Sequence, residues 1–252
     1  MGAMAWLQFR QILAGRKVWL VVFLLALPVG LTGLIVSVGG WSDLPEEEIL
    51  QAVYLFVLYP QSICLLLALL YGTSVLNEEL EGKTVTYLFT RPLERWRILV
   101  GKYAAVVACL AVPALGSLGI SWWLMGSPGG ASYILGFALA VLGALAAYTA
   151  IFTAFGVLFR TRTLVIGLLY AITIEFVLSF VPAVVSSLSA AYYLRSVVVR
   201  VARLELPKEL LPFVGESSLL GAALLLGAIT AGGLGLASFV CRRREYVVTE
   251  QL

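Results

Sequence analysis

Two features of this sequence could carry chemistry: a charged segment from 77 to 102, and a glutamate at position 175 inside an apolar run. The segment holds five of the 17 Lys and Arg residues and four of the 14 Asp and Glu residues, in about a tenth of the chain. Charge concentrated in this way suits the docking of a water-soluble partner. The segment therefore predicts an interaction surface.

Within that segment, Gly82, Lys83 and Thr84 copy the end of a phosphate-binding loop. A true loop of this kind needs another glycine five positions before Gly82, and position 77 is Asn. It also needs a preceding strand. We therefore expect no nucleotide site on this chain, and any energy from ATP must come from a partner.

The sequence has few residues that could catalyse a reaction or bind a metal. The chain has no histidine, and its three cysteines, at 64, 109 and 241, fall in or at the end of apolar runs without paired spacing. An intramembrane enzyme would need paired acids or a nucleophile with its base at one depth. An ion channel would need a filter-like glycine run, and none is evident. We expect no enzyme activity, no metal and no cofactor on this chain.

The composition of the chain predicts the secondary structure that carries the 77–102 segment and Glu175. With 61% hydrophobic and only 12% charged residues, the chain is predicted to be an all-α integral membrane protein forming a single transmembrane domain over 1–252. Apolar runs of this length exclude the short alternating strands of a membrane barrel. Six transmembrane helices are expected, near 18–38, 53–75, 103–125, 132–158, 164–185 and 218–240.

Prolines at 28, 60 and 113 are expected to kink the first three spans. A cleavable signal peptide is a weaker interpretation of the first span, because residues 6–17 precede it and no clear small-residue cleavage site follows before Trp41. Small residues repeat at four-residue spacing in two later spans, a pattern that lets helix backbones approach closely. These stripes are Gly136-Ala140-Ala144 and Gly227-Ala231-Gly235.

The distribution of positive charge predicts the orientation. Counting loops on alternate sides, thirteen basic residues fall on one side: Arg10, Arg16, Lys17, Lys83, Arg91, Arg95, Arg97, Lys102, Arg160, Arg162, Arg242, Arg243 and Arg244. The other side holds Arg195, Arg200, Arg203 and Lys208. Basic loops stay in the cytoplasm. Both termini and the 77–102 segment are therefore expected to be cytoplasmic.

Two segments outside the spans are expected to be amphipathic helices. In the outer segment 186–217, apolar residues recur at helical spacing while Arg195, Arg200 and Arg203 fall on the other side of the wheel, which indicates a helix in the outer interface ended by Pro207. A short solvated loop helix explains the pattern equally well. The first 17 residues suggest a cytoplasmic interfacial helix.

Glu175 lies 13 positions beyond Arg162, which is about 20 Å along a helix and deep in the bilayer. A charge near the centre costs about 2.5–3.5 kcal/mol even on the mild insertion scale. The residue should therefore face the bundle, a partner or water, or be protonated. It is an intramembrane functional candidate, and the alternative is a structural anchor bonded, for example, to Tyr148, Thr149 or Thr153.

The 77–102 segment holds, in order, acidic residues, Gly-Thr, an apolar stretch, Pro, a basic residue and Gly-Lys, in the form of Glu78, Glu79, Glu81, Gly82, Thr84, Leu88, Pro92, Arg95, Gly101 and Lys102. In this order the segment resembles that of the permease subunits of type-2 ABC exporters. Two departures are Lys83, inserted before Thr84, and Glu94, where the family has Ser. Ile174-Glu175-Phe176, running on to Pro182, and the basic end at 242–245 also resemble that family.

In that family the segment is a cytoplasmic coupling helix, between spans two and three, that contacts a separate ATPase subunit. The resemblance implies that role for residues 78–97, through Glu78, Glu79, Glu81, Gly82, Thr84, Leu88, Phe89, Arg91, Pro92 and Arg95. The family fold also places short outer-side helices between spans five and six, which makes Arg195, Arg200 and Arg203 candidates for an outer gate.

Together these features predict the permease subunit of an ATP-driven exporter in a plasma membrane, typically the inner membrane of a prokaryotic cell. Its expected partners are an ABC ATPase subunit that holds ATP and magnesium, a second copy or a homologous permease, and membrane lipids, but no nucleic acid. The alternative is a membrane-embedded assembly subunit that docks a soluble protein other than an ATPase. The residues do not select a substrate.

Overall fold

The computed structural model describes residues 17–41, 47–74, 95–159, 162–180, 189–204 and 218–243. Within these ranges every regular element is helical, in agreement with the predicted all-α class. The elements are α2 (Lys17–Ser37), α3 (Glu47–Phe56), η1 (Val57–Ile63), α4 (Cys64–Gly72), α7 (Arg95–Leu124), α8 (Gly130–Leu158), α9 (Thr163–Tyr170), η2 (Ala171–Val177), η3 (Leu178–Phe180), α10 (Ala190–Ala202) and α11 (Leu219–Arg243).

Five helices are long and apolar enough to cross a membrane: Val18–Ser37, Glu47–Gly72, Ile98–Leu124, Gly130–Leu158 and Leu219–Arg242. They coincide with five of the six predicted spans. The remaining prediction, 164–185, meets the shorter apolar helix Thr163–Val177. Since a crossing needs about 17–25 residues, six uninterrupted spans are not confirmed.

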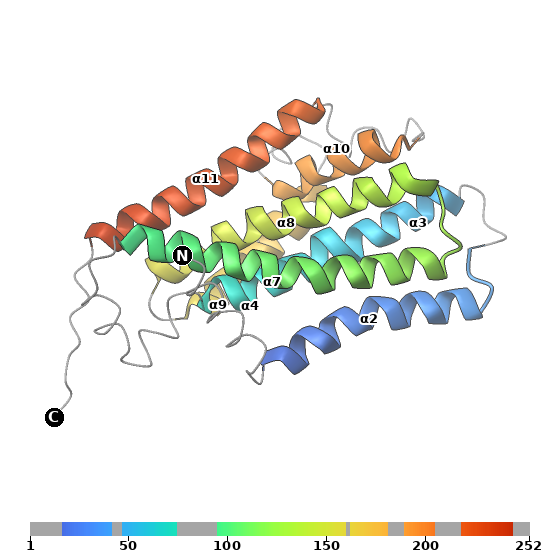
Figure 1. Cartoon of the computed structure of the whole chain (residues 1–252), viewed down its shortest axis with the longest axis horizontal. Coiled ribbons are helices and arrows are strands. Elements are labelled where there is room, and N and C mark those ends of the chain that lie inside the picture. Colours follow the sequence, from blue (N-terminus) through green and yellow to red (C-terminus); the bar gives the residue numbers. More distant parts are fainter. Residues whose placement is uncertain are drawn as a thin grey trace.

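Side-chain hydrogen bonds join neighbouring long helices. Thr32 in α2 lies 3.1 Å from the hydroxyl of Tyr54 in α3, and the hydroxyl of Ser117 in α7 donates to the Leu25 carbonyl of α2, 2.7 Å away. In Figure 1, α3 runs opposite to α2, and α7 runs in the same direction as α2. Figure 1 shows the resulting bundle, in which α8 packs against α4, α7, α10 and α11.

Two stretches of the bundle are π-helical, η1 in the second span and η2 after α9. Each ends with a backbone bond across five residues, from the Cys64 amide to the Tyr59 carbonyl and from the Leu178 amide to the Thr173 carbonyl. Pro60 lies inside η1, and because proline has no amide hydrogen, it prevents a regular α-helical bond there. Pro28 and Pro113 lie inside α2 and α7 instead, where the helix stays α-helical.

Helix α10 packs closely on the small residues of α8. A Cβ atom at Gly136 would lie 3.1 Å from the Ala202 amide nitrogen and 3.2 Å from the Val198 carbonyl oxygen. One at Gly143 would lie 3.3 Å from Leu194. Early residues of α8 thus contact late residues of α10, so the two helices run antiparallel and side by side. The sequence had predicted an amphipathic helix in the outer interface, without this packing along α8.

Helix α10 also ends earlier than predicted. Arg203 adopts a left-handed conformation with φ 54°, and the Arg203 and Leu204 amides both donate to the Val199 carbonyl. This is a complete helix C-terminus. The helix therefore stops at Ala202, and Pro207, which was predicted to end it, lies outside the described residues.

The second small-residue stripe behaves differently from the first. No atom lies within 4 Å of a Cβ placed at Gly227 or Gly235, whereas one at Gly233, off the stripe, would lie 2.9 Å from the Ala150 carbonyl oxygen. Helix α11 therefore contacts α8 through Gly233, and the predicted stripe faces away from the described bundle.

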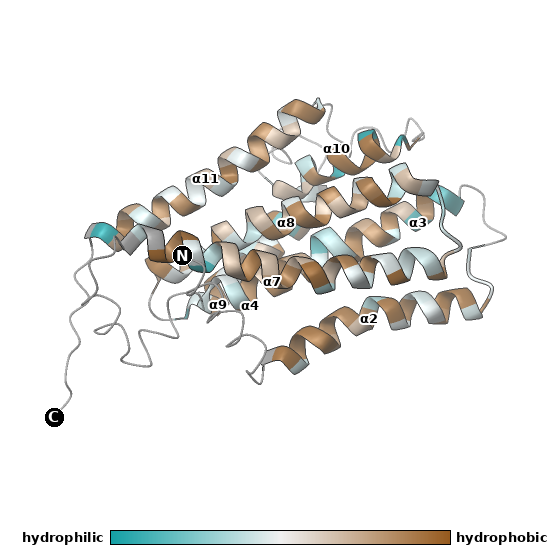
Figure 2. Cartoon of the chain, in the orientation of Figure 1, coloured by the Kyte–Doolittle hydropathy of each residue, from teal (hydrophilic) through white to brown (hydrophobic). Residues whose placement is uncertain are grey.

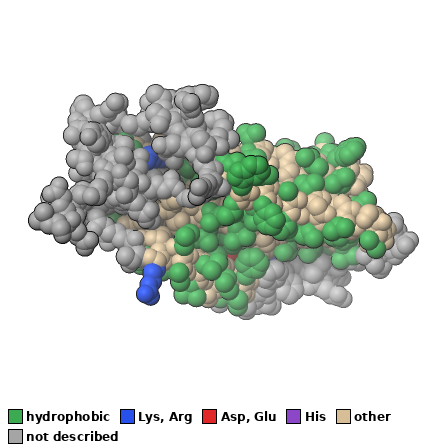
Figure 3. Space-filling view, turned by 90° about the horizontal axis from the view of Figure 1, so that it is seen from below, with side chains coloured by type: hydrophobic (Ala, Val, Ile, Leu, Met, Phe, Trp, Pro, Cys, Tyr) green, Lys and Arg blue, Asp and Glu red, His purple; other side chains and the backbone are tan. Residues whose placement is uncertain are grey.

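The outer surface of the bundle is strongly apolar. Large side chains such as Trp19, Phe23, Leu220 and Leu224 are exposed. Brown, hydrophobic residues run along most helices in Figure 2, with teal at the end of α11 and the start of α3. Figure 3 shows hydrophobic side chains spread over much of the described face. Such a surface suits lipid contact.

Candidate functional site around Glu175

Glu175 lies in η2 with no exposed surface, where the sequence analysis placed a deep carboxylate. Three hydroxyls donate hydrogen bonds to it. The Tyr148 and Ser189 hydroxyls lie 3.0 and 2.8 Å from Oε2, and the Tyr170 hydroxyl lies 3.1 Å from Oε1. These donors come from α8, from the residue before α10 and from α9, so one side chain joins three elements.

Two backbone amides complete the site. The Ala190 amide donates to Oε1 of Glu175 and the Ala191 amide to Oε2, each at 3.1 Å. They belong to the first turn of α10, where helix amides have no intrahelical partner and the helix dipole is positive. Ser189 is the N-cap residue of α10, and its hydroxyl also accepts from Ala191 at 3.1 Å. Glu175 therefore caps a helix that follows it in the chain.

Five donors saturate this carboxylate, because its two oxygens offer about four lone-pair directions. A carboxylate that is already saturated has little capacity to bind a cation from outside. The arrangement instead stabilises an ionised side chain away from water, since hydrogen bonds offset the cost of burying a charge. Its geometry is that of an internal anchor.

Gln61, in η1, reaches the same site from the second span. Its side-chain amide donates to the backbone carbonyl of Glu175 at 2.9 Å and to the Ser179 hydroxyl at 3.2 Å. Gln61 has no exposed surface. It thus connects one π-helical segment directly to the other.

Arg195 connects α10 to the end of η3. Its guanidinium donates to the Ser179 carbonyl and, at 3.5 Å, to the Ala191 carbonyl, and it lies 6.0 Å from the centre of the Phe56 ring. Arg195 and Glu175 are therefore both buried in one hydrogen-bonded network, in which Arg195 and Gln61 both bond to Ser179.

The placement of Arg195 corrects the predicted helical wheel. Arg195 is only 9% exposed, whereas Arg200 and Arg203 are exposed. The reason is geometric: at about 100° per residue, positions 195 and 200 are about 140° apart and cannot share one helix face. A wheel angle calculated for each arginine would have revealed this from the sequence.

The other candidate partners of Glu175 show which predictions the structure supports. Tyr148 donates to Glu175, as the anchor interpretation suggested. Thr149 and Thr153 are buried, and neither hydroxyl has a hydrogen-bond partner among the described residues. Sequence reasoning missed Tyr170, Ser189 and Gln61, although a glutamine beside Pro60 in an apolar run was a detectable signal.

The predicted coupling segment lies almost entirely outside the described residues, including Glu78, Glu79, Glu81, Gly82, Thr84, Leu88, Phe89, Arg91 and Pro92. The predicted N-terminal interfacial helix also lies outside them. Arg95 begins α7, eight residues before the predicted start of the third span, and Lys102 is buried in that helix. Among the described residues, no group of three or more His, Cys, Asp or Glu is placed to hold a metal ion.

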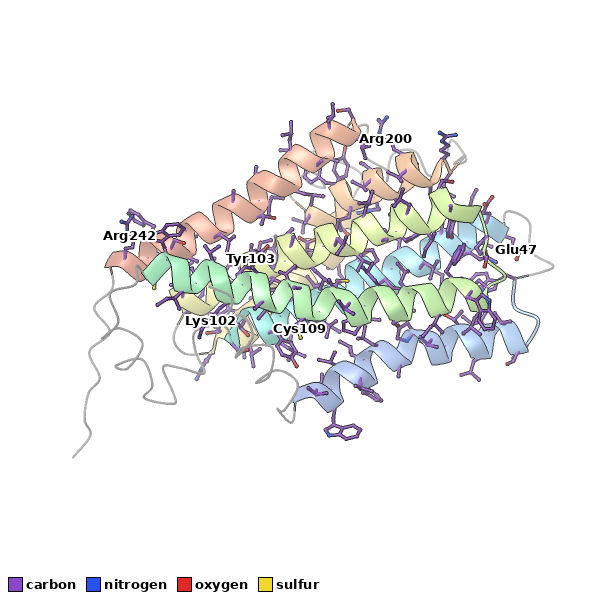
Figure 4. The ribbon with its side chains drawn as sticks, in the orientation of Figure 1. Glu47, Lys102, Tyr103, Cys109, Arg200 and Arg242 are labelled. Atoms are coloured by element: carbon purple, nitrogen blue, oxygen red, sulfur yellow. The ribbon has the colours of Figure 1, made fainter. Side chains whose placement is uncertain are left out.

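Charged residues gather at the two ends of the bundle (Figure 4). Lys102 and Arg242 lie at one end, and Glu47 and Arg200 lie at the other. The apolar helices between them match the length of a membrane crossing. This is the charge pattern of a chain that passes through a membrane several times.

A family model described as "ABC-2 family transporter protein" matches residues 3–197. This chain belongs to the ABC-2 transporter family. No curated protein and no solved structure matches it. As an ABC-2 family member the chain is a multi-pass membrane subunit for transport that is not catalytic by itself, and such permeases normally pair with an ATPase subunit. The match includes the whole Glu175 site and runs into α10.

Proposed function

We propose that this ABC-2 family member is the permease subunit of an ATP-driven exporter, forming its pathway with a second copy or a homologous permease. The observation that carries the proposal is the family match over 3–197 on a bundle of apolar helices that run alternately up and down. ATP and magnesium would bind to the partner ATPase.

The fifth crossing in chain order, the one that is not a single long helix, is a broken one in this proposal. Helix α9 with η2 and η3 covers the first part, and α10 covers the rest. Two contacts support this order. Glu175 bonds to Tyr148, in the second half of α8, and Ala202 at the end of α10 contacts Gly136, near the start of α8. The chain from Glu175 to Ala202 therefore runs along α8 toward the start of that helix. Broken helices are tolerated at membrane depth when their free backbone groups are satisfied by protein, as Glu175 does here.

The orientation we propose places both termini in the cytoplasm of a prokaryotic cell and the chain in its inner membrane. Support comes from the ends of the bundle, where Lys102 and Arg242 share an end and Glu47 lies at the other. The positive-inside rule assigns the first end to the cytoplasm. Arg200 and Arg203 then lie at the outer end, where we propose that they contribute to an outer gate.

Coupling to the ATPase is assigned to residues 78–97. The segment connects α4 to α7, the second and third spans, and is the densest group of charges in the sequence. Closure of the ATPase pair would push on this segment and tilt both helices. Such a movement reaches the outer side only if the spans are linked to α10, and Glu175 is the residue that we propose holds α10 in place.

Purification of the tagged chain from its native membrane in mild detergent, followed by mass spectrometry, tests the proposal. A stoichiometric ATPase subunit should co-purify, and scrambling residues 78–97 should remove it. A matched variant with residues 205–217 scrambled, which we assign to the opposite side, should retain the ATPase. Gel filtration shows whether each variant is still folded.

Two outcomes would overturn the proposal. An ATPase that stays bound when residues 78–97 are scrambled would remove the coupling role from this segment. A soluble partner that is not an ATPase would instead identify the chain as a membrane-embedded assembly subunit.

A further inference from the structure

Two π-helical turns in different spans lie next to each other. η1 interrupts the second span around Pro60, and η2 follows α9 and contains Glu175. Gln61 of η1 bonds to the Glu175 carbonyl, so the contact joins π turn to π turn. Single π turns inside α-helices are frequent at functional sites.

A π turn is a natural two-state element. Its bonds span five residues rather than four, so conversion to an α turn rotates the helix beyond it by about 100°, the angle of one residue. Pro60 opposes the α form in η1, because it cannot donate the required bond. Ser62 adds a side-chain bond to the Val57 carbonyl at 2.6 Å within the same irregular segment.

The second π segment is in turn tied to the start of α10. Glu175 bonds to Ser189 and to the first two amides of α10. Ser179, the other residue that Gln61 contacts, accepts a bond from Arg195 at its carbonyl. Both bonds made by the Gln61 amide therefore end on residues that also hold α10.

We propose that Gln61 is a positioning residue that transmits movement of the second span to the outer helix α10, through the Glu175 backbone and Ser179. This inference rests on the proposed function, because it supplies the step between the coupling segment and the outer side. Helix α4 continues from η1 toward the coupling segment. A rotation of α4 therefore reaches Gln61 first, and α10 follows because the same two residues carry both sets of bonds.

Gln61→Met tests the link, because methionine keeps the length of the side chain and removes both donors. The matched control is Gln51→Met. Gln51 is also buried in the second span, but among the described residues its amide bonds to Glu47 alone, one turn away, at 2.8 Å. Gln61→Asn is the second variant, because it keeps a polar amide but is one methylene too short for either bond.

The first readout is hydrogen exchange of the α10 amides at 190–194 in the purified full-length chain. We expect exchange to become about three- to ten-fold faster in Gln61→Met and Gln61→Asn, and to be unchanged in Gln51→Met. Unchanged exchange at α10 in both Gln61 variants would overturn the inference. This readout requires no partner, so it stands even if no ATPase is found.

The second readout separates transmission from simple stabilisation. Spin labels at Trp123→Cys and Arg200→Cys, both exposed, report the distance between α7 and α10 in the complex with its ATPase, with and without trapped nucleotide. The nucleotide-dependent change should be present in wild type and Gln51→Met, and lost in Gln61→Met while ATP is still hydrolysed. A change of wild-type size in Gln61→Met would contradict the transmitting role. A wild-type complex without any change would contradict the proposed function.

Discussion

The hydroxyl of Tyr170 donates a hydrogen bond to Oε1 of Glu175, 3.1 Å away, although the residues are five positions apart in one helix. In an α-helix, that spacing separates two side chains by about 140° around the axis. The π-helical turn of η2 brings them to the same side. The irregular backbone is therefore part of the Glu175 site.

Replacing Tyr170 by Phe removes this donor and keeps the ring, which packs edge-on against Phe152 and Phe155. We expect a loss of about 1.5–3 kcal/mol in the free energy of unfolding, because one hydrogen bond to a carboxylate disappears. Thermal unfolding of the purified chain measures it. The control is Tyr133→Phe, since the buried Tyr133 hydroxyl has no hydrogen-bond partner among the described residues. Equal losses in both variants would show that the bond contributes nothing.

Changing Glu175 to Gln should destabilise the protein by about 1–3 kcal/mol. The amide presents its own donors where five donors already converge, so at least one buried group loses its partner. Glu47→Gln makes the same change on an exposed side chain and should stay within about 0.5 kcal/mol. Unfolding in detergent compares the stabilities of the two variants. A Glu175→Gln protein with normal stability and normal transport would show that Glu175 is only a tolerated polar residue.

Alanine substitutions at two glycines should have opposite effects. Gly136→Ala places a methyl group 3.1 Å from the Ala202 amide, and we expect a net destabilisation of about 1 kcal/mol as α10 is pushed off α8. Gly119→Ala meets no atom within 4 Å and should stabilise α7 by about 0.5–1 kcal/mol. The melting temperatures of the two variants test this prediction. A higher melting temperature for Gly136→Ala would show that α8 and α10 are loosely packed at position 136.

Reversing the charge at Glu81 or Arg95 should uncouple ATP hydrolysis from transport, because both residues belong to the proposed docking segment. The variants Glu81→Lys and Arg95→Glu should still insert into the membrane. Glu48→Lys, an exposed residue at the opposite end of the bundle, is the control and should leave coupling intact. ATPase activity measured together with transport in reconstituted vesicles tests this. Unchanged coupling would remove both residues from the docking role.

Five of the spans were predictable because length and apolar composition alone decide them, with α8 within two residues of its predicted start. The predicted span at 164–185 was not confirmed as a single helix, because its apolar run continues through residues where the helix becomes irregular. Hydropathy measures the preference for lipid and carries no information on whether backbone bonds span four or five residues. Glu175 in η2 bonds to Tyr148 and to α10, and neither partner is a neighbour in sequence.

The position of the Glu175 site could be predicted from the sequence, but most of its hydrogen-bond partners could not. The depth of Glu175 follows from counting residues, and burial required partners for its charge. Which partners these are depends on tertiary packing, and two of the five donors are backbone amides, which no side-chain pattern can reveal. The antiparallel placement of α10 against Gly136 was equally out of reach, although the small residue itself signalled a close approach.

The capping of α10 by Glu175 has a consequence for how the chain is made. The Tyr148 donor is synthesised 27 residues before Glu175, but the Ala191 amide emerges 16 residues after it. While the growing chain is being inserted, the carboxylate therefore enters the bilayer before its last donors exist. Until α10 arrives the side chain lacks these donors, so we expect the segment from Glu175 to Ala191 to reach its final packing only after α10 has been inserted.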